Sequence, residues 1–315
     1  MDVLTGMLSE VRSSGALFGR TIMDTPWAVR FADGAQLTLV TMVRSGGWIV
    51  PDGDRPVRLS TRDIAIVVGP APFTIADEPG AGSPPRYVMH APTLCTTADG
   101  EEIGDQLLLG TRTCGDSLDS PNVLLTGTYQ VRGRMSDRLL NALPRVLVVP
   151  DEGKPYPIMD LLIAEIDRDA PGQQAILDRL LDLALLSTLR EWFTRPEASP
   201  PPWYRALGDS TVGGALRALH DEPAKPWTVA SLAREAGVSR ATFARRFGEL
   251  LGEPPMAYLT GWRLGLAADL LHRTDATVEA IARQVGYSSA YALSAAFKRH
   301  FGTRPTEHRA LSVVA

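Results

Sequence analysis

The sequence lacks long apolar runs and contains very little cysteine. No stretch of its 315 residues reaches about 18 uninterrupted apolar residues, the least that spans a bilayer, so we expect no membrane domain. Residues 1–20 mix charged side chains into short apolar runs and lack the apolar core of a secretory signal. The two cysteines are too few for a secreted disulfide framework or a Cys-only zinc site, and a reducing cytoplasm is the expected compartment.

The charge of the chain is small overall but unevenly distributed. The 32 Lys and Arg against 36 Asp and Glu give a net charge of −4. Residues 222–315 contain 12 basic and 8 acidic side chains, a net +4, which leaves −8 for residues 1–221. The length and a hydrophobic content of 44% predict about two globular domains, with the basic charge concentrated in the last third.

Residues 1–150 consist mainly of short apolar runs separated by turn residues. The predicted strands are residues 36–43, 47–50, 64–68, 87–91, 106–111 and 123–131. Dipeptides such as Gly46-Gly47 and Gly69-Pro70 supply the turns between them. This rhythm predicts a β-sandwich or a small barrel.

A helical segment follows over residues 151–195, after a short helix near Ser136 and a further strand at 145–149. Two helices are predicted at residues 157–167 and 173–193. The apolar band of the second is wider than one contact face requires, so either both surfaces are covered within the chain or one is a homodimer contact. The Pro-rich residues 195–203 cannot continue this helix, and residues 196–221 are predicted as a linker.

The last part of the chain, residues 222–315, contains an internal repeat. Its two copies match at an offset of 49 residues and, after one inserted residue, at an offset of 50. The matched pairs are Thr228/Thr277, Val229/Val278, Ala233/Ala282, Gly237/Gly286, Ser239/Ser288, Phe247/Phe297, Gly252/Gly302 and Pro255/Pro305.

Each copy has the pattern of a helix-turn-helix. In the first copy Thr228 begins a short helix, Gly237 supplies the turn and Ser239 caps a second helix that Phe243 and Phe247 anchor inward. The exposed candidates for DNA contact in the first copy are Ser239, Arg240, Ala241, Thr242, Ala244, Arg245 and Arg246. Those in the second copy are Ser288, Ser289, Ala290, Tyr291, Ser294, Lys298 and Arg299.

Residues 256–271 predict a continuous helix of about 24 Å between the two copies. Such a spacer suits two reading helices that enter successive major-groove faces about 34 Å apart on one side of a duplex.

Residues 222–311 resemble the DNA-binding domain of the AraC/XylS family of bacterial transcription regulators. The segment Ile281-Ala-Arg-Gln-Val-Gly-Tyr-Ser-Ser and the segment Phe297-Lys-Arg-His-Phe-Gly-Thr-Arg-Pro305 carry this resemblance. Residues 19–27, 37–53, 59–70 and 143–149 resemble the cupin-like sensor domain of one branch of the family. The expected fold is therefore α+β and multidomain, with a β-barrel or sandwich at residues 1–150, a helical dimerisation segment at 151–195 and an all-α bipartite helix-turn-helix domain at 222–315.

The resemblance implies a sequence-specific regulator of transcription, an activator rather than a repressor, that is not an enzyme. The expected partners are double-stranded DNA, a second copy of the chain, RNA polymerase and a small-molecule effector, with no membrane. Among the first copy's reading positions, Ala241, Ala244 and Arg245, the arginine is the expected base contact, to guanine. The second copy departs from the family's longer side chains, so the first is predicted to supply most direct readout and the second backbone contacts through Ser288, Ser289, Lys298 and Arg299.

The N-terminal domain offers few groups for catalysis. A cupin-type metal centre needs about three histidines and a carboxylate, yet only His90 of the five histidines lies there, so no metal and no cofactor are predicted. The segments Gly115-Asp-Ser-Leu118 and Asp269-Leu-Leu-His272 match two motifs of an esterase family. No esterase is predicted, because the histidine lies at the end of the helix between the two repeat copies and the serine does not follow an N-terminal strand.

The signal received by the N-terminal domain is predicted to be a small molecule or a redox event. Strand alternation suggests as ligand contacts Trp27, Arg30, Thr38, Trp48 and Phe73. A redox role would fall to Cys95 and Cys114, near which only Arg112 could depress a thiol pKa. The alternatives are a constitutive DNA-binding protein whose β domain only dimerises and, less favoured, a cupin-type enzyme.

Overall fold

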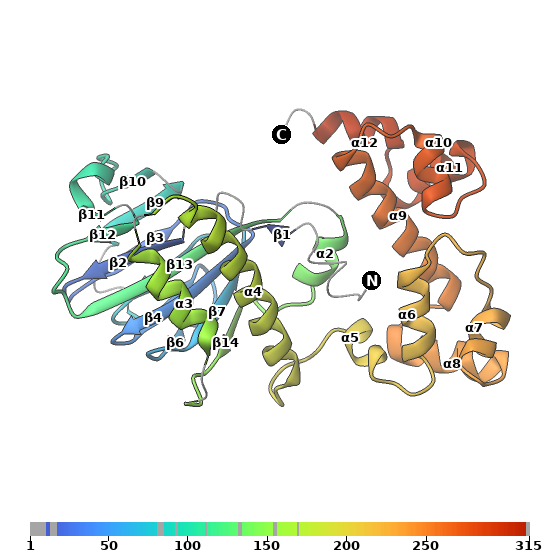
Figure 1. Ribbon diagram of the computed structural model, residues 1–315, viewed down its shortest axis with the longest axis horizontal. Helices are drawn as coiled ribbons and strands as arrows, with labels where there is room; N and C mark the ends of the chain where they lie inside the picture. Colours follow the sequence, from blue (N-terminus) through green and yellow to red (C-terminus); the bar gives the residue numbers. More distant parts are fainter. Residues whose placement is uncertain are drawn as a thin grey trace. The chain divides into compact units, whose positions relative to one another are not determined.

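The computed structural model describes residues 11–12, 18–80, 85–91, 94–110, 112–131, 134–153, 156–168 and 170–312 (Figure 1). The chain forms two compact units. The β-rich unit contains Val11–Val131 and Leu143–Ala198, and the helical unit contains the chain from Ser199 onward together with helix α2 (Arg134–Leu140). Within the described part of the chain, no helix is long and apolar enough to cross a bilayer.

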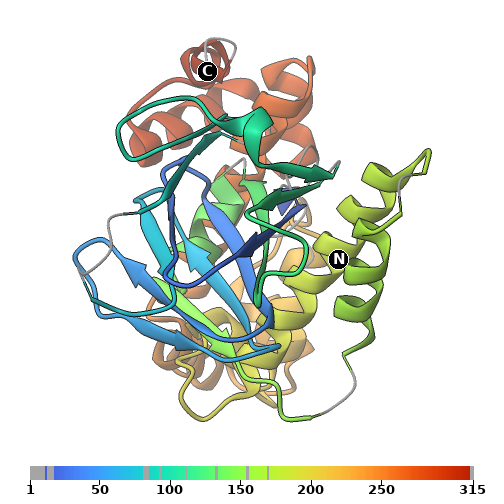
Figure 2. The ribbon, with the colours of Figure 1, turned by 90° about the vertical axis from the view of Figure 1, so that its left-hand side faces the viewer.

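The β-rich unit is built from two sheets, whose layers are visible in Figure 2. The first sheet has the order β11 (Leu108–Gly110), β12 (Thr113–Gly115), β2 (Phe18–Met23), β13 (Asn122–Val131), β4 (Leu37–Arg44), β7 (Ile64–Val68) and β14 (Val146–Val149), and β1 (Val11–Arg12) also pairs with β13. The second has the order β10 (Leu94–Thr96), β9 (Tyr87–Ala91), β3 (Ala28–Phe31), β8 (Phe73–Ala76), β5 (Gly47–Pro51) and β6 (Val57–Leu59).

The core of this unit consists of apolar side chains contributed by both sheets. Val40 and Leu124 come from the first sheet, and Ile49 and Ile75 from the second. Because successive side chains of a strand point to opposite faces, each sheet presents one apolar face to this core. The predicted sandwich is confirmed. A short 3-10 helix, η1 (Gly104–Leu107), precedes β11 where one longer strand was predicted.

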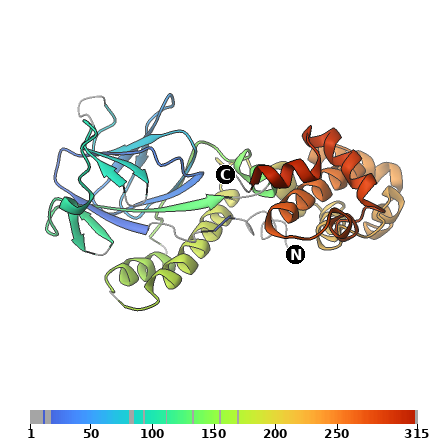
Figure 3. The same ribbon diagram turned by 90° about the horizontal axis from the view of Figure 1, so that it is seen from above.

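Two helices, α3 (Pro157–Ile166) and α4 (Gln173–Thr194), pair with each other beside the first sheet (Figure 3). The Tyr129 hydroxyl of β13 donates a hydrogen bond of 2.8 Å to the Leu181 carbonyl oxygen, which ties α4 to that sheet. Both helices lie within about one residue of their predicted bounds, because an apolar helical period is the strongest signal that a sequence carries.

The predicted linker, residues 196–221, contains two helices. Helix α5 (Pro202–Leu207) begins at a proline, which suits the first helical position because its missing N–H needs no partner there. Helix α6 (Gly213–Asp221) follows. Trp203 and Leu216 are buried in the helical unit, so only residues 195–201 connect α4 to it.

The two repeat copies fold alike. The first contains α7 (Val229–Glu235) and α8 (Arg240–Leu251), and the second contains α10 (Val278–Gln284) and α11 (Ala290–Phe301). The predicted spacer is α9 (Pro255–Arg273), and α12 (Pro305–Ser312) follows the second copy. Helix α10 is offset by 49 residues from α7, and α11 is offset by 50 from α8. The inserted residue therefore lies in the turn of the second copy, between α10 and α11.

Each copy has its own apolar cluster. Phe243 and Phe247 are fully buried in the first, together with α5, α6 and the start of α9. Leu293 and Phe297 are fully buried in the second, together with the rest of α9. The two reading helices are therefore fixed by separate cores that share one spacer helix.

Candidate nucleic-acid interface

Helix α8 presents the face predicted for the first copy. The Ser239 hydroxyl accepts a hydrogen bond of 3.1 Å from the Thr242 amide and so caps the helix. With Phe243 and Phe247 turned inward, the helix exposes Arg240, Ala241, Thr242, Arg245 and Arg246, and Ala244 is half-buried.

Two of these arginines already pair with carboxylates. Arg245 donates from one Nη to Glu249 Oε1 at 2.6 Å, although 68% of its side chain remains exposed. Arg246 donates to Asp209 Oδ2 from Nε at 3.0 Å and from Nη2 at 2.7 Å. Among the described residues Arg240 makes no ion pair. Helix α8 therefore offers, in the described part of the chain, one unpaired guanidinium, that of Arg240, and one held only by an exposed intrahelical pair, that of Arg245.

Asp209 was not predicted as a site residue. It lies between α5 and α6, where its carboxylate also accepts hydrogen bonds from the Thr211 and Val212 amides at 2.9 and 3.0 Å. Burial would raise the pKa of Asp209, but these amides and the Arg246 guanidinium outweigh it and hold that pKa below its ordinary value. Asp209 thus joins the end of α5 to the reading helix, a contact 37 positions apart in sequence that no local pattern indicates.

Helix α11 has the same frame but a different surface. Its cap is Ser289, whose hydroxyl accepts a hydrogen bond of 3.2 Å from the Ala292 amide, whereas Ser288 was the position matched from the sequence. Tyr291 is 85% exposed, and Lys298 and Arg299 are exposed at the far end of the helix. Ala290 and Ser294 are half-buried.

A carboxylate occupies the N-terminus of α11. Glu279 of α10 accepts a hydrogen bond of 2.7 Å from the Ala290 amide and pairs with Arg283. These two donors hold the pKa of Glu279 below its ordinary value, so the group is charged at neutral pH. Its negative charge neutralises the positive end of the helix dipole, where a DNA phosphate would otherwise be favoured. The equivalent position in the first copy, 49 residues earlier, is Ala230.

The five predicted ligand contacts lie apart from the cavity described below. Trp27 and Phe73 lie in the core, and Thr38 is buried in β4. Arg30 makes a bidentate pair with Asp52 at 3.0 and 2.6 Å, and Trp48 lies under the Arg58 guanidinium.

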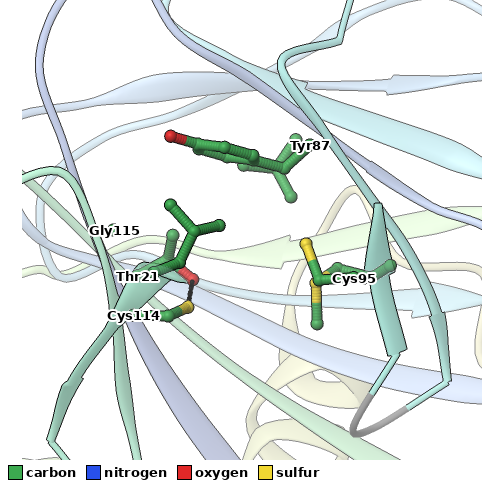
Figure 4. Close-up of a pocket in the computed structure, with 8 residues that line it drawn as sticks. Thr21, Tyr87, Cys95, Cys114 and Gly115 are labelled. Carbon is green, nitrogen blue, oxygen red and sulfur yellow. Dashed lines mark hydrogen bonds between the residues drawn. The ribbon is translucent and has the colours of Figure 1, made fainter. Parts of the chain in front are cut away.

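Other residues form a small cavity between the edges of the two sheets, shown in Figure 4. It is lined by Thr21, Val29, Tyr87, Met89, Cys95, Leu107, Cys114 and Gly115, none of which was predicted as a ligand contact except for the redox candidates Cys95 and Cys114. Its volume of about 10 Å³ is room for about one water molecule.

The two thiols are free and protonated at neutral pH. Burial raises the pKa of Cys95 to about 11 and raises that of Cys114 above its ordinary value. Arg112, the one nearby cation in the sequence, donates instead to the side-chain oxygens of Gln173 and Gln174. Across the described residues, no three His, Cys, Asp or Glu side chains are grouped so that they could hold a metal ion.

The esterase-like motif serves a structural purpose. Asp116 accepts hydrogen bonds from the Asp24 amide, the Arg86 guanidinium and the Tyr87 hydroxyl at 2.8–3.0 Å. His272 contacts His308 instead, Nε2 to Nε2 at 2.7 Å, within the helical unit. The serine and histidine of the motif therefore belong to separate units.

Comparison with known proteins gives two family matches. Residues 2–194 match a cupin family, Cupin_6, and residues 232–310 match a helix-turn-helix domain family, HTH_18. The chain is 31% identical over 315 residues to an AraC-like transcription regulator of Streptomyces lividans, with 98% of each chain covered. It is 28% identical over 316 residues to the HTH-type transcriptional regulator AlkR of Acinetobacter baylyi, covering 98% of this chain and 99% of that one.

A solved structure is also similar to part of the chain. The crystal structure of the DNA-binding domain of AdpA in complex with a target DNA is 29% identical and covers 36% of this chain and 93% of that chain, with a TM-score of 0.31.

Proposed function

Since the chain belongs to the AraC family of DNA-binding transcription regulators and carries a Cupin_6 domain, we propose that it acts as a homodimer that activates transcription from paired DNA half-sites. In this proposal it binds double-stranded DNA through α8 and α11, contacts RNA polymerase, and catalyses no reaction. A signal at the β-rich unit changes how the dimer presents its DNA-binding units.

The observation that carries the DNA-binding roles is the basic, exposed face of α8. Arg245 donates to guanine O6 and N7 after it exchanges its partner Glu249 for the base. Arg240 and the open N-terminus of α8 bind phosphates, together with the hydroxyls of Ser239 and Thr242. The small side chains of Ala241 and Ala244 leave room for α8 to approach the DNA closely. Arg246 orients the helix through its pair with Asp209.

Helix α11 has the lesser role in this proposal. Tyr291 contacts bases or sugars through its exposed ring, while Ser294 and Ala290 line the approach to it. Lys298 and Arg299 bind phosphates at the opposite end from Glu279. Phosphate contacts through Ser288 and Ser289 require that the charge of Glu279 be offset.

Dimerisation is assigned to the exposed face of α3 and α4. Leu161, Ile176 and Leu183 are 47–55% exposed, and the last two are seven positions apart on one stripe of α4. An exposed apolar stripe of this kind is typical of a protein–protein contact. The sedimentation of Leu183→Glu tests it: the variant should be monomeric, whereas Leu118→Glu, a change at an equally exposed leucine on a turn, should leave the dimer intact.

The signal is a redox event or a ligand at the cavity that contains Cys95 and Cys114. A metabolite of ordinary size does not fit a cavity of about 10 Å³, since ligand pockets measure about 300–1,000 Å³. The second candidate is a constitutive DNA-binding protein whose β-rich unit only dimerises.

Selection of genomic fragments on the purified protein at physiological salt tests the proposed function. Wild type should enrich a few sites with paired half-sites, and Arg245→Ala should lose that enrichment. Equal enrichment by the variant would remove Arg245 from base recognition. Retention without sequence preference in wild type would contradict a specific regulator.

A further inference from the structure

Three residues with sulfur in their side chains line the cavity in the β-rich unit. Cys95 lies on β10, Met89 on β9 and Cys114 on β12, so the two sheets each contribute a thiol. Figure 4 shows Cys95 and Cys114 on opposite sides of the cavity. Since the free space is about that of one water molecule, an occupant of this size is a single ion rather than an organic molecule.

We propose that this cavity binds one soft monovalent metal ion, of the class of Cu(I), through the Sγ atoms of Cys95 and Cys114 with the thioether of Met89 as a weaker third ligand. The proposal rests on the proposed function in that it names the ligand class for the signal site. It concerns a different donor set from the histidine and carboxylate centre that the sequence excludes.

The donor chemistry of the cavity favours this class of ion. Thiolate and thioether sulfur select Cu(I), whereas divalent zinc in a structural site needs four ligands. The oxygen atoms nearby are engaged: the Tyr87 hydroxyl donates to Asp116 at 2.8 Å, and the Thr21 hydroxyl contacts Cys114 Sγ at 3.6 Å. Val29 and Leu107 supply apolar wall and no ligand atom, which leaves the sulfur atoms as the available donors.

One wall of the cavity is fixed and the other is adjustable. On the Cys114 side, β12 pairs directly with β2, and a Cβ atom at Gly115 would lie 1.8 Å from the Ile22 carbonyl oxygen, so these backbones cannot separate or approach freely. On the other side β10 is an edge strand, and its pairing with β9 shifts register between Leu94 and Cys95. In this proposal, movement of this edge strand brings the Cys95 thiol to a metal held by Cys114.

Binding is an exchange of protons for the metal, with no change of oxidation state. Two S–H bonds break, two Cu–S bonds form, copper remains Cu(I), and both protons go to solvent. Because two protons are released for each ion bound, the apparent affinity should rise with pH, by up to about 100-fold per pH unit.

The test is competition for Cu(I) between the full chain and bathocuproine disulfonate under anaerobic conditions. Wild type should withdraw one Cu(I) per chain from the probe. Cys95→Ser and Cys114→Ser should each lower the affinity by about 100-fold or more, because one of two strong bonds is lost. Met89→Leu should lower it by about 10-fold, whereas the matched Met256→Leu in α9 should leave it unchanged.

Thermal melting of each variant without metal verifies that it folds, and Cys95→Ala replaces Cys95→Ser if the buried hydroxyl unfolds the unit. Equal copper affinity of wild type and the double serine variant would overturn the site. A stoichiometry of one copper per two chains would also overturn it, because that indicates a bridge between thiols of different chains.

Parallel DNA selection separates this inference from the proposed function. If the protein binds no copper but enriches specific DNA sites, the proposed metal site is wrong and the proposed function is supported. If the protein binds copper but retains DNA without sequence preference, the proposed metal site is supported and the proposed function is wrong.

Discussion

The two helix-turn-helix copies share one frame and differ in charge. At matched positions 50 residues apart, α8 has Arg240, Arg245 and Arg246 where α11 has alanine each time. Conversely, Ala241 in α8 corresponds to the exposed Tyr291 in α11. The helix N-terminus is open in the first copy and occupied by Glu279 in the second. Duplication preserved the packing positions, and the surface positions diverged toward different contacts.

Substitutions in the buried cores that the two copies share should have the largest effect, on the stability of the fold. Phe247→Ala and Phe297→Ala each remove a fully buried ring at the same place in the two cores. Each should lower the free energy of unfolding by about 3–5 kcal/mol, as measured by urea denaturation. Markedly unequal losses would mean that the two cores are not equivalent supports.

The difference in charge predicts unequal losses of DNA affinity. Arg245→Ala should cost about 1–3 kcal/mol of binding free energy to a selected site, because a bidentate base contact is lost. Tyr291→Ala should cost less. Fluorescence anisotropy at fixed salt measures both, and a larger loss for Tyr291→Ala would reverse the assignment of the dominant reader.

The carboxylate at α11 can be neutralised without removing its hydrogen bond. Glu279→Gln retains an oxygen that accepts from the Ala290 amide but removes the charge, so phosphate becomes more favourable at that helix end. DNA affinity should rise and the dependence of log K on log salt should steepen by up to about 1 unit. Glu307→Gln, which alters a similar carboxylate contact on the Arg304 amide, is the matched control. No change in either variant would show that α11 takes no phosphate there.

Asp209 gives the first copy an acid-sensitive support. Because its folded pKa is lowered, its contribution to stability is present above the unfolded value of about 4 and is lost as the pH falls through the folded value. Between pH 7 and pH 3, the free energy of unfolding should therefore fall less in Asp209→Asn than in wild type, by about 1 kcal/mol or less. Urea midpoints between pH 3 and 7 measure this difference. An equal fall of the midpoint in wild type and variant would show that Asp209 does not stabilise the fold.

The helices and the repeat were predictable from sequence because their signals are local. The caps Thr228 and Ser239, the buried Phe pairs and the spacer helix all follow from residues within one or two turns of each other. Glu279 and Asp209 were missed because each acts on an element that tertiary packing brings close. In the β-rich unit the predicted ligand contacts and the residues that line the cavity are different sets, since strand alternation tells which face a residue occupies but not where along the sandwich a cavity forms.

The short connection at Arg195–Pro201 sets a length scale for the dimer. Helix α4 ends at Thr194 and α5 begins at Pro202, so seven residues, three of them proline, join these two helices. A proline-rich segment extends by about 3.1 Å per residue, which limits the tether to about 22 Å. If α4 joins two copies, this tether and the connections of α2 to β13 and β14 together limit which spacings between half-sites one dimer can bridge. Lengthening residues 195–201 with glycine and serine measures the share of that limit set by the tether, as a broader range of occupied promoters.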